Sequence, residues 1–148
     1  MVSYINSYPS DEKYRARLVS RTDDSIAISG LTRDAVFQLD GFVDNLTIGS
    51  SCKIQGDSGR DRTDQHVTST LTIDATCLVF EAEGLRLNDV AVSVGASAIY
   101  RFRNCVFEGE VSFGAGALDQ LEFENCSFGG AGVQFDGSTT AVFVRMAG

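Results

Sequence analysis

The sequence predicts an all-β protein, a single-stranded right-handed parallel β-helix of about six turns with about 21 residues per turn and an irregular N-terminal segment. A hexapeptide pattern recurs at a spacing of 21 residues. Pairs of apolar residues at positions i and i+2 also return with nearly this period along residues 25–148. Self-similarity at a fixed period of this length is the sequence signature of a solenoid.

The repeat is clearest in the C-terminal half, where the pattern FxNCxF spans Phe102–Phe107 and then Phe123–Phe128. The apolar pairs form three columns, each expected to supply one strand per turn. The first column is Ile26/Ile28, Leu46/Ile48, Leu78/Phe80, Tyr100/Phe102, Leu121/Phe123 and Val142/Val144. The second is Phe37/Leu39, Leu71/Ile73, Val92/Val94, Val111/Phe113 and Val133/Phe135. The third is Cys52/Ile54, Leu85/Leu87, Cys105/Phe107 and Cys126/Phe128.

Three short strands per turn, with Gly, Ala, Asp and Asn at the corners, are typical of a parallel β-helix whose turns stack about 4.8 Å apart. No segment with helical periodicity links the strands, which argues against an α/β fold.

Two segments depart from the repeat. Residues 1–24 are expected to cap the open end of the β-helix or to form an arm that grips a neighbour, and residues 11–21 have the pattern of a short helix. Residues 55–70 are polar and are expected to form a loop inserted between two strands. The predicted organisation is therefore an N-terminal arm or cap, 1–24, followed by a β-helix domain, 25–148.

The outward positions distinguish two kinds of surface. Charge alternates in sign from turn to turn through Glu81, Arg103, Glu124 and Arg145, and Arg101 is expected beside Glu122, as in-register stacking requires. One outward column is uncharged on every turn: Gln38, Thr72, Ser93, Ser112 and Gln134. This column predicts a face that contacts another protein surface; the alternative is simple β-propensity in a small sample.

No arrangement of residues predicts catalysis. His66, the single histidine, is expected to be a solvated loop residue, and the GDSG of Gly56–Gly59 resembles a serine-protease motif only superficially. Asp40, Asp74 and Asp136 fit turns better than calcium ligands, and Asn104 and Asn125 fit a structural ladder at one corner. We therefore predict no enzyme activity, no cofactor and no metal.

The four cysteines lack the spacing of a zinc site. Cys105 and Cys126 share a column, where a disulfide is geometrically possible and a reduced, buried stack is favoured. The first residues contain no apolar signal core and no run is long enough to span a membrane, so we expect a soluble chain with reduced thiols. A net charge of −8 argues against nucleic-acid binding.

The three-strand turn with its Asn and Phe columns resembles the right-handed β-helices of the pectate-lyase-like class over residues 25–148. Enzymes of that class use clustered Asp with Arg or Lys on one face. This chain has two lysines, Lys13 and Lys53, and no matching acidic cluster, so no catalytic residue carries over. Pentapeptide-repeat proteins hold a stricter 20-residue period than this chain does.

A small, acidic, non-catalytic β-helix with an irregular N-terminal segment also resembles virion accessory proteins, either capsid decoration (cement) proteins or tail-spike fragments, which are usually trimers. The resemblance implies a homotrimer on a virion assembled in the host cytoplasm, bound to the major capsid protein or another shell protein. The uncharged column and Phe143 are then the trimer interface. The shell-docking residues are Tyr4, Tyr8, Lys13, Arg15, Arg17 and Arg21. A carbohydrate-binding or carbohydrate-active β-helix is the alternative, and a free bacterial scaffold protein is a third hypothesis.

Overall fold

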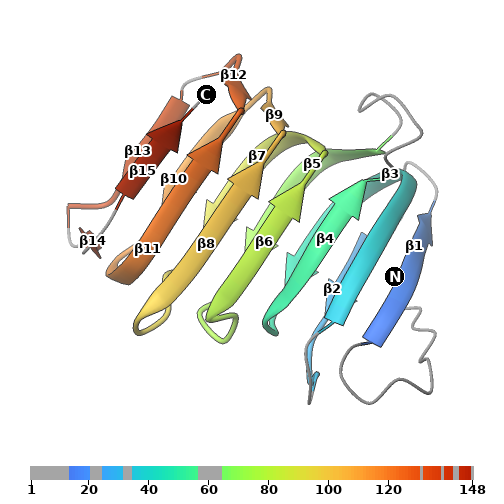
Figure 1. Ribbon diagram of the computed structural model, residues 1–148, viewed down its shortest axis with the longest axis horizontal. Coiled ribbons are helices and arrows are strands. Elements are labelled where there is room, and N and C mark those ends of the chain that lie inside the picture. Colours follow the sequence, from blue (N-terminus) through green and yellow to red (C-terminus); the bar gives the residue numbers. More distant parts are fainter. Residues whose placement is uncertain are drawn as a thin grey trace.

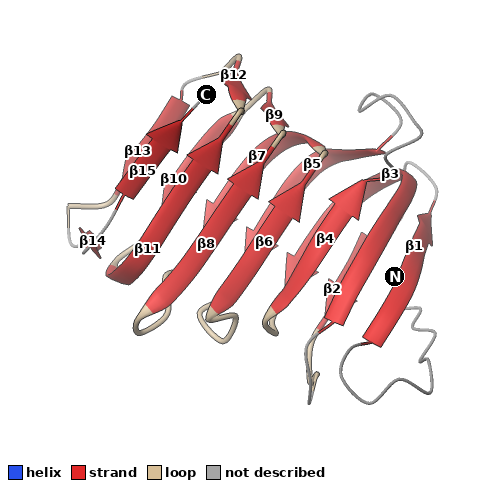
Figure 2. Cartoon of the chain, in the orientation of Figure 1, coloured by secondary structure: helices blue, strands red, loops and turns tan. Residues whose placement is uncertain are grey.

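The computed structural model is a parallel β-solenoid of about five turns with about 21 residues per turn (Figure 1). It describes residues 14–20, 25–31, 35–56, 65–130, 132–137, 139–141 and 144–147. Within these ranges every regular element is a strand and none is a helix (Figure 2). The all-β, parallel, stacked architecture predicted from the repeat is thus confirmed, with about five turns where about six were expected.

Each turn crosses three faces, and the strands on each face pair in parallel with those of the next turn. The first face contains β1 (Tyr14–Ser20), the beginning of β3 (Ala35–Ile48), β4 (Cys52–Gly56), β6 (Val79–Glu83), β8 (Ala98–Arg103), β11 (Gly116–Glu124) and β15 (Val144–Ala147). A further strand, β14 (Thr139–Ala141), pairs with the start of β11.

The second face is short and the third is longer. The second contains the middle of β3, the beginnings of β5 (Gln65–Ile73) and β7 (Arg86–Val92), then β9 (Val106–Phe107) and β12 (Ser127–Phe128). The third contains β2 (Ser25–Ile28), the ends of β3, β5 and β7, then β10 (Glu110–Phe113) and β13 (Gly132–Phe135). Irregularities in the pairing of β3 with β5 and of β5 with β7 let these strands turn from the second face onto the third.

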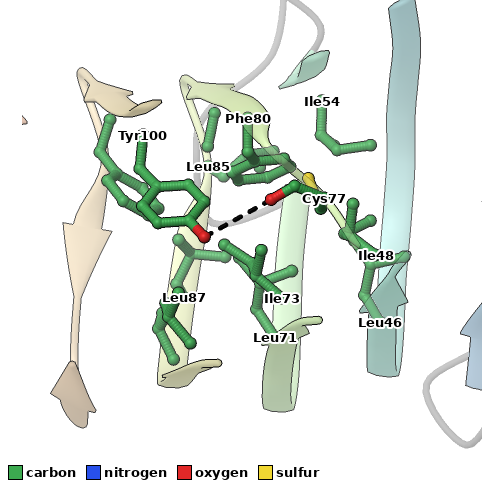
Figure 3. Packing of buried hydrophobic residues seen from close by; sticks show 14 of the residues in the cluster. Leu46, Ile48, Ile54, Leu71, Ile73, Cys77, Phe80, Leu85, Leu87 and Tyr100 are labelled. Atoms are coloured by element: carbon green, nitrogen blue, oxygen red, sulfur yellow. Dashed lines mark hydrogen bonds between the residues drawn. The ribbon is translucent and has the colours of Figure 1, made fainter. Parts of the chain in front are cut away.

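Apolar side chains from all three faces fill the interior (Figure 3). Parallel stacking places like rings one above another: Phe102 lies on Phe123 with ring centroids 5.3 Å apart, and Phe107 lies on Phe128 at 5.0 Å. Among the described residues the interior holds the phenol of Tyr100, whose hydroxyl donates a hydrogen bond to the Cys77 carbonyl at 3.4 Å. Burial of this hydroxyl raises the pKa of Tyr100 above its usual value.

The corner between the first and second faces requires a left-handed backbone on successive turns. Asn104 and Asn125 adopt φ of 53° and 52°, and Gly84 holds the equivalent position with φ of 69°. The Asn125 side-chain amide donates to the Asn104 side-chain oxygen at 2.7 Å. This contact confirms the predicted asparagine ladder. Asparagine suits the corner because it tolerates positive φ better than other non-glycine residues.

The structure corrects the alignment of several apolar pairs. Phe80 lies beside Tyr100, and Ala82 lies beside Phe102, so the pair on this turn is Phe80/Ala82 rather than Leu78/Phe80. Leu78 is 43% exposed. The prediction failed here because it sought two large apolar residues and passed over a small one.

The same shift of two residues recurs in other columns, where it preserves the alternation of inward and outward positions. On the first face Val144/Met146 follows Leu121/Phe123, in place of Val142/Val144, and Cys52/Ile54 also belongs to this face. On the third face Ile26/Ile28, Leu46/Ile48, Leu71/Ile73, Val90/Val92, Val111/Phe113 and Val133/Phe135 share one column. Phe37/Leu39 was expected in this column but lies on the first face, where it pairs with Ile54 and Gly56.

Two predictions about irregular segments were wrong in part. Residues 14–20 form strand β1, not a helix, and Ala16 and Leu18 pair with Phe37 and Leu39 of β3. The strand satisfies backbone groups along β3 that a helix would leave unpaired. Residues 65–70 of the predicted loop belong to β5, and residues 57–64 lie outside the described ranges.

Candidate functional site

The outward side of the third face carries a central column without a single charge. Its members lie in register on six successive strands: Ala27, Thr47, Thr72, Ala91, Ser112 and Gln134. We call this surface the uncharged face. The first five side chains are small and partly exposed, and Gln134 is exposed.

The predicted column and the observed one share three residues, Thr72, Ser112 and Gln134. Ser93 was expected in the column but lies just beyond the end of β7, where its backbone N–H donates to the Ile73 carbonyl at 2.8 Å. Gln38 was also expected there but lies on the first face, opposite Gln55. The Ser93 error is the two-residue shift described above, whereas Gln38 was assigned to the wrong face.

Sequence reasoning missed Ala27, Thr47 and Ala91 as members of the column. One signal was present: residues 46–48 and 71–73 are the same tripeptide, LTI, and they stack directly on each other. Aligning these identical tripeptides first would have placed Leu71/Ile73 in the correct column.

A shallow groove of about 390 Å³ runs over the uncharged face. Its outward polar side chains are Thr72, Ser93, Ser112, Gln134 and Asp136. The Ser112 hydroxyl lies 3.4 Å from the Val90 carbonyl, its hydrogen-bond acceptor.

The borders of the uncharged face carry acids and no described cation. Asp89 and Glu110 stand on one side of the column, and Asp74 and Asp136 stand on the other. The Asp89 carboxylate accepts a hydrogen bond from the backbone N–H of Glu110 at 3.0 Å. Asp74 and Asp136 each begin a turn, in which their carbonyls accept from the N–H groups of Cys77 and Thr139 at 2.9 Å.

The first face differs sharply, because charges of opposite sign alternate along it. One column runs Lys53, Glu81, Arg101, Glu122 and Arg145, and the next includes Glu83, Arg103 and Glu124. Lys53 Nζ lies 2.7 Å from Glu83, Arg103 lies 3.0 Å from Glu81, and Arg101 lies 3.3 Å from Glu122. The predicted alternation is confirmed, although Glu81 aligns with Arg101 instead of Arg103, and Arg145 with Glu122 instead of Glu124.

The second face holds a small polar cluster around His66, which lies at the start of β5 and not in a solvated loop. Its side chain is 16% exposed, and its ring centroid is 6.1 Å from that of Phe42. His66 Nε2 lies 3.3 Å from the Glu108 carboxylate. Two guanidinium nitrogens of Arg86 donate hydrogen bonds to the same carboxylate. Burial, and then the Arg86 charge, lower the pKa of His66, while the Arg86 hydrogen bond lowers the pKa of Glu108.

Several predicted site residues cannot be placed with their side chains. Arg15 and Arg17 belong to β1, where they pair with Val36 and Gln38 of β3. The other shell-docking candidates, Tyr4, Tyr8, Lys13 and Arg21, lie outside the described residues, as does the interface candidate Phe143.

Among the described residues, no group of three or more His, Cys, Asp and Glu side chains is arranged to hold a metal ion. No described helix is long and apolar enough to cross a membrane. Comparison of the chain with protein-family models, curated proteins and solved structures found no match of any of the three kinds.

Proposed function

We propose that this protein is a non-catalytic structural protein that forms a homotrimer through its uncharged face and decorates a viral shell. The observation that supports the proposal most is the contrast between faces. A neutral column of six residues runs along the third face, whereas charges alternate along the first.

The uncharged face suits contact between copies for physical reasons. Small side chains such as Thr72, Ala91 and Ser112 let backbones approach closely. Like charges brought together around a threefold axis would repel one another, and this column has none to bring together. Closed cyclic symmetry is the common way for identical chains to bury a shared surface.

The shell-bound part of the proposal rests on the N-terminal residues and on the resemblance to decoration proteins. Arg15 and Arg17 lie on β1, a strand at one end of the sheet that the first face forms. Together with Tyr4, Tyr8, Lys13 and Arg21, they would dock on the major capsid protein or another shell protein, which places the assembled protein on the virion.

Lysine substitution in the uncharged column tests the trimer. Thr72→Lys combined with Ser112→Lys places six added positive charges near the proposed axis and should convert trimer to monomer, as measured by light scattering. The matched control is Gln55→Lys, which adds a cation to the first face opposite Glu83 and should leave the trimer intact. A double variant that stays trimeric contradicts the choice of face.

A carbohydrate-binding role is the second candidate, and the groove favours it. Its hydroxyl, amide and carboxylate groups, from Thr72, Ser93, Gln134 and Asp136, could hydrogen-bond to sugar hydroxyls. The two candidates differ in the same experiment: a monomeric wild-type protein that binds soluble oligosaccharides, and loses them on lysine substitution of Ser112, supports this role instead.

A further inference from the structure

We propose that Cys105 and Cys126 form a thiol pair that a low-molecular-weight disulfide converts into a cross-link between two successive turns. No disulfide joins any of the four cysteines in the structure. The inference does not depend on the oligomeric state or on the proposed function.

The backbone holds the two cysteines directly opposite each other. On one side of them Val106 pairs with Ser127, and on the other the Asn125 side chain bonds to Asn104 at 2.7 Å. The Ser127 N–H donates to the Cys105 carbonyl at 3.1 Å. Adjacent parallel strands lie about 4.8 Å apart, which falls within the range of roughly 4.4–6.8 Å between the Cα atoms of a disulfide.

The Sγ atoms of the two cysteines also lie near neighbouring backbone carbonyls at the end of β8. Cys105 Sγ lies 3.3 Å from the Arg103 carbonyl, on its own turn. Cys126 Sγ reaches back across the turns to lie 3.3 Å from the neighbouring carbonyl of Phe102. Both sulfur atoms therefore meet at the end of β8, where a hydrogen bond between the thiols raises the pKa of Cys105.

Exposure sets the order of the reaction. Cys105 is fully buried, whereas Cys126 is partly exposed and lines an apolar hollow of about 280 Å³ beside Phe123, Phe128 and Met146. An external reagent therefore reaches Cys126 first, and Cys105 is reached only through Cys126.

The chemistry is a double thiol–disulfide exchange. The Cys126 thiolate attacks glutathione disulfide, forms a mixed disulfide and releases one glutathione thiolate. The Cys105 thiolate then attacks the Cys126 sulfur, forms the Cys105–Cys126 bond and releases the second glutathione thiolate. The protein loses two electrons and two protons, and the electrons reduce one glutathione disulfide to two glutathione molecules.

The remaining cysteines provide an internal comparison. Cys77 is fully buried and Cys52 is 8% exposed. Burial raises the pKa of Cys77 to about 12 and also raises the pKa of Cys52. Both thiols are therefore expected to react with an external disulfide more slowly than the partly exposed Cys126 while the protein is folded.

Intact-mass measurement and peptide mapping of the folded protein, after incubation with glutathione disulfide, test the proposal. The expected result is a loss of the mass of two hydrogen atoms, one linked peptide pair containing Cys105 and Cys126, and a higher melting temperature that a reducing agent reverses. An unchanged mass, or a glutathione adduct at Cys126 that never resolves, would overturn it.

Two single variants test the order of attack. Cys105→Ala should retain one glutathionyl group on Cys126, whereas Cys126→Ala should remain unmodified. Modification of Cys105 in the second variant contradicts the order. Reaction at Cys52 and Cys77 would reveal an unfolded variant in the same peptide map, and the wild-type measurement then decides the proposal alone.

Discussion

At the scale of single residues, stability depends on aromatic rings that repeat from turn to turn. Phe102 is fully buried, stacks on Phe123 and meets the edges of Phe80 and Phe107 at centroid distances of 6.0 and 5.5 Å. A ring at this position thus contacts neighbours on its own turn and on both adjacent turns, so its removal leaves a cavity that close-packed neighbours fill only in part.

Phe102→Ala should therefore lower the free energy of unfolding by roughly 3–5 kcal/mol, the usual cost of removing a buried ring. Phe135→Ala is the matched control, because Phe135 also stacks on a neighbour, Phe113, but is 46% exposed and should cost much less. Denaturant unfolding measures both. Equal losses in the two variants would contradict the observed packing.

The second residue-scale prediction concerns acid. Burial and Arg86 lower the pKa of His66 below its usual 6.5, so the unfolded chain binds a proton there more readily than the folded chain does. The stability that neutral His66 retains above pH 6.5 should then be lost progressively as the pH falls through this value.

His66→Gln should flatten the loss of stability between about pH 7.5 and 5.5, because it removes the titrating group. Thermal unfolding across this range measures the effect. Glu108, whose pKa Arg86 lowers, adds a separate loss nearer its usual value of 4.5, and that loss should persist in the variant. Identical pH profiles for wild type and variant would rule out His66 as the source.

At the scale of elements, one turn contains an insertion at the corner between its first and second faces. Gly56 pairs with Leu39 and Gln65 pairs with Gly41. The chain between Gly56 and Gln65 therefore contains residues 57–64, whereas the preceding turn has only Asp40 between the partner residues. On the following turn, Gly84 joins Leu85 directly at the equivalent position. The two ends of the insertion are therefore already close in the sheet.

Replacing residues 57–64 with one glycine should leave the solenoid folded, because closing a short gap between neighbouring strand ends costs little. Circular dichroism and the melting temperature measure the outcome, which should stay within a few degrees of wild type. The control replaces Asn104 and Asn125 by Val, which opposes the left-handed corner and should destabilise the fold strongly. Loss of folded protein in the glycine variant would show that the insertion contributes to packing.

These elements also show what sequence alone could predict. Side-chain alternation and the 21-residue repeat suffice for the solenoid, for the asparagine corner and for the Leu85/Leu87, Cys105/Phe107 and Cys126/Phe128 column. They do not determine register within a face, because a shift of two residues leaves every inward residue inward. Phe80/Ala82 was misaligned for this reason, and Ser93 was placed in the uncharged column for the same reason. Gln38 was assigned to the wrong face, because β3 crosses all three faces and offers several alternating apolar pairs.

At the scale of the whole molecule, charge is distributed by face. Lys53, Arg101 and Arg103 belong to the first face, Arg86 belongs to the second, and no described cation belongs to the third. Ion pairs on an exposed face contribute about 0–1 kcal/mol each, so the alternating charges serve register and solubility more than stability. The uncharged face is the surface that we propose for contact between copies.

The mass of the wild-type protein in solution tests this account most directly. Light scattering at micromolar concentration should give three times the 15.9 kDa mass of one chain. The value should not fall at high salt, because the column has no ion pairs to screen and salt can only weaken repulsion between the acids at its borders. A mass of one chain under both conditions would contradict the proposed assembly, and dissociation in salt alone would place the interface on the charged first face.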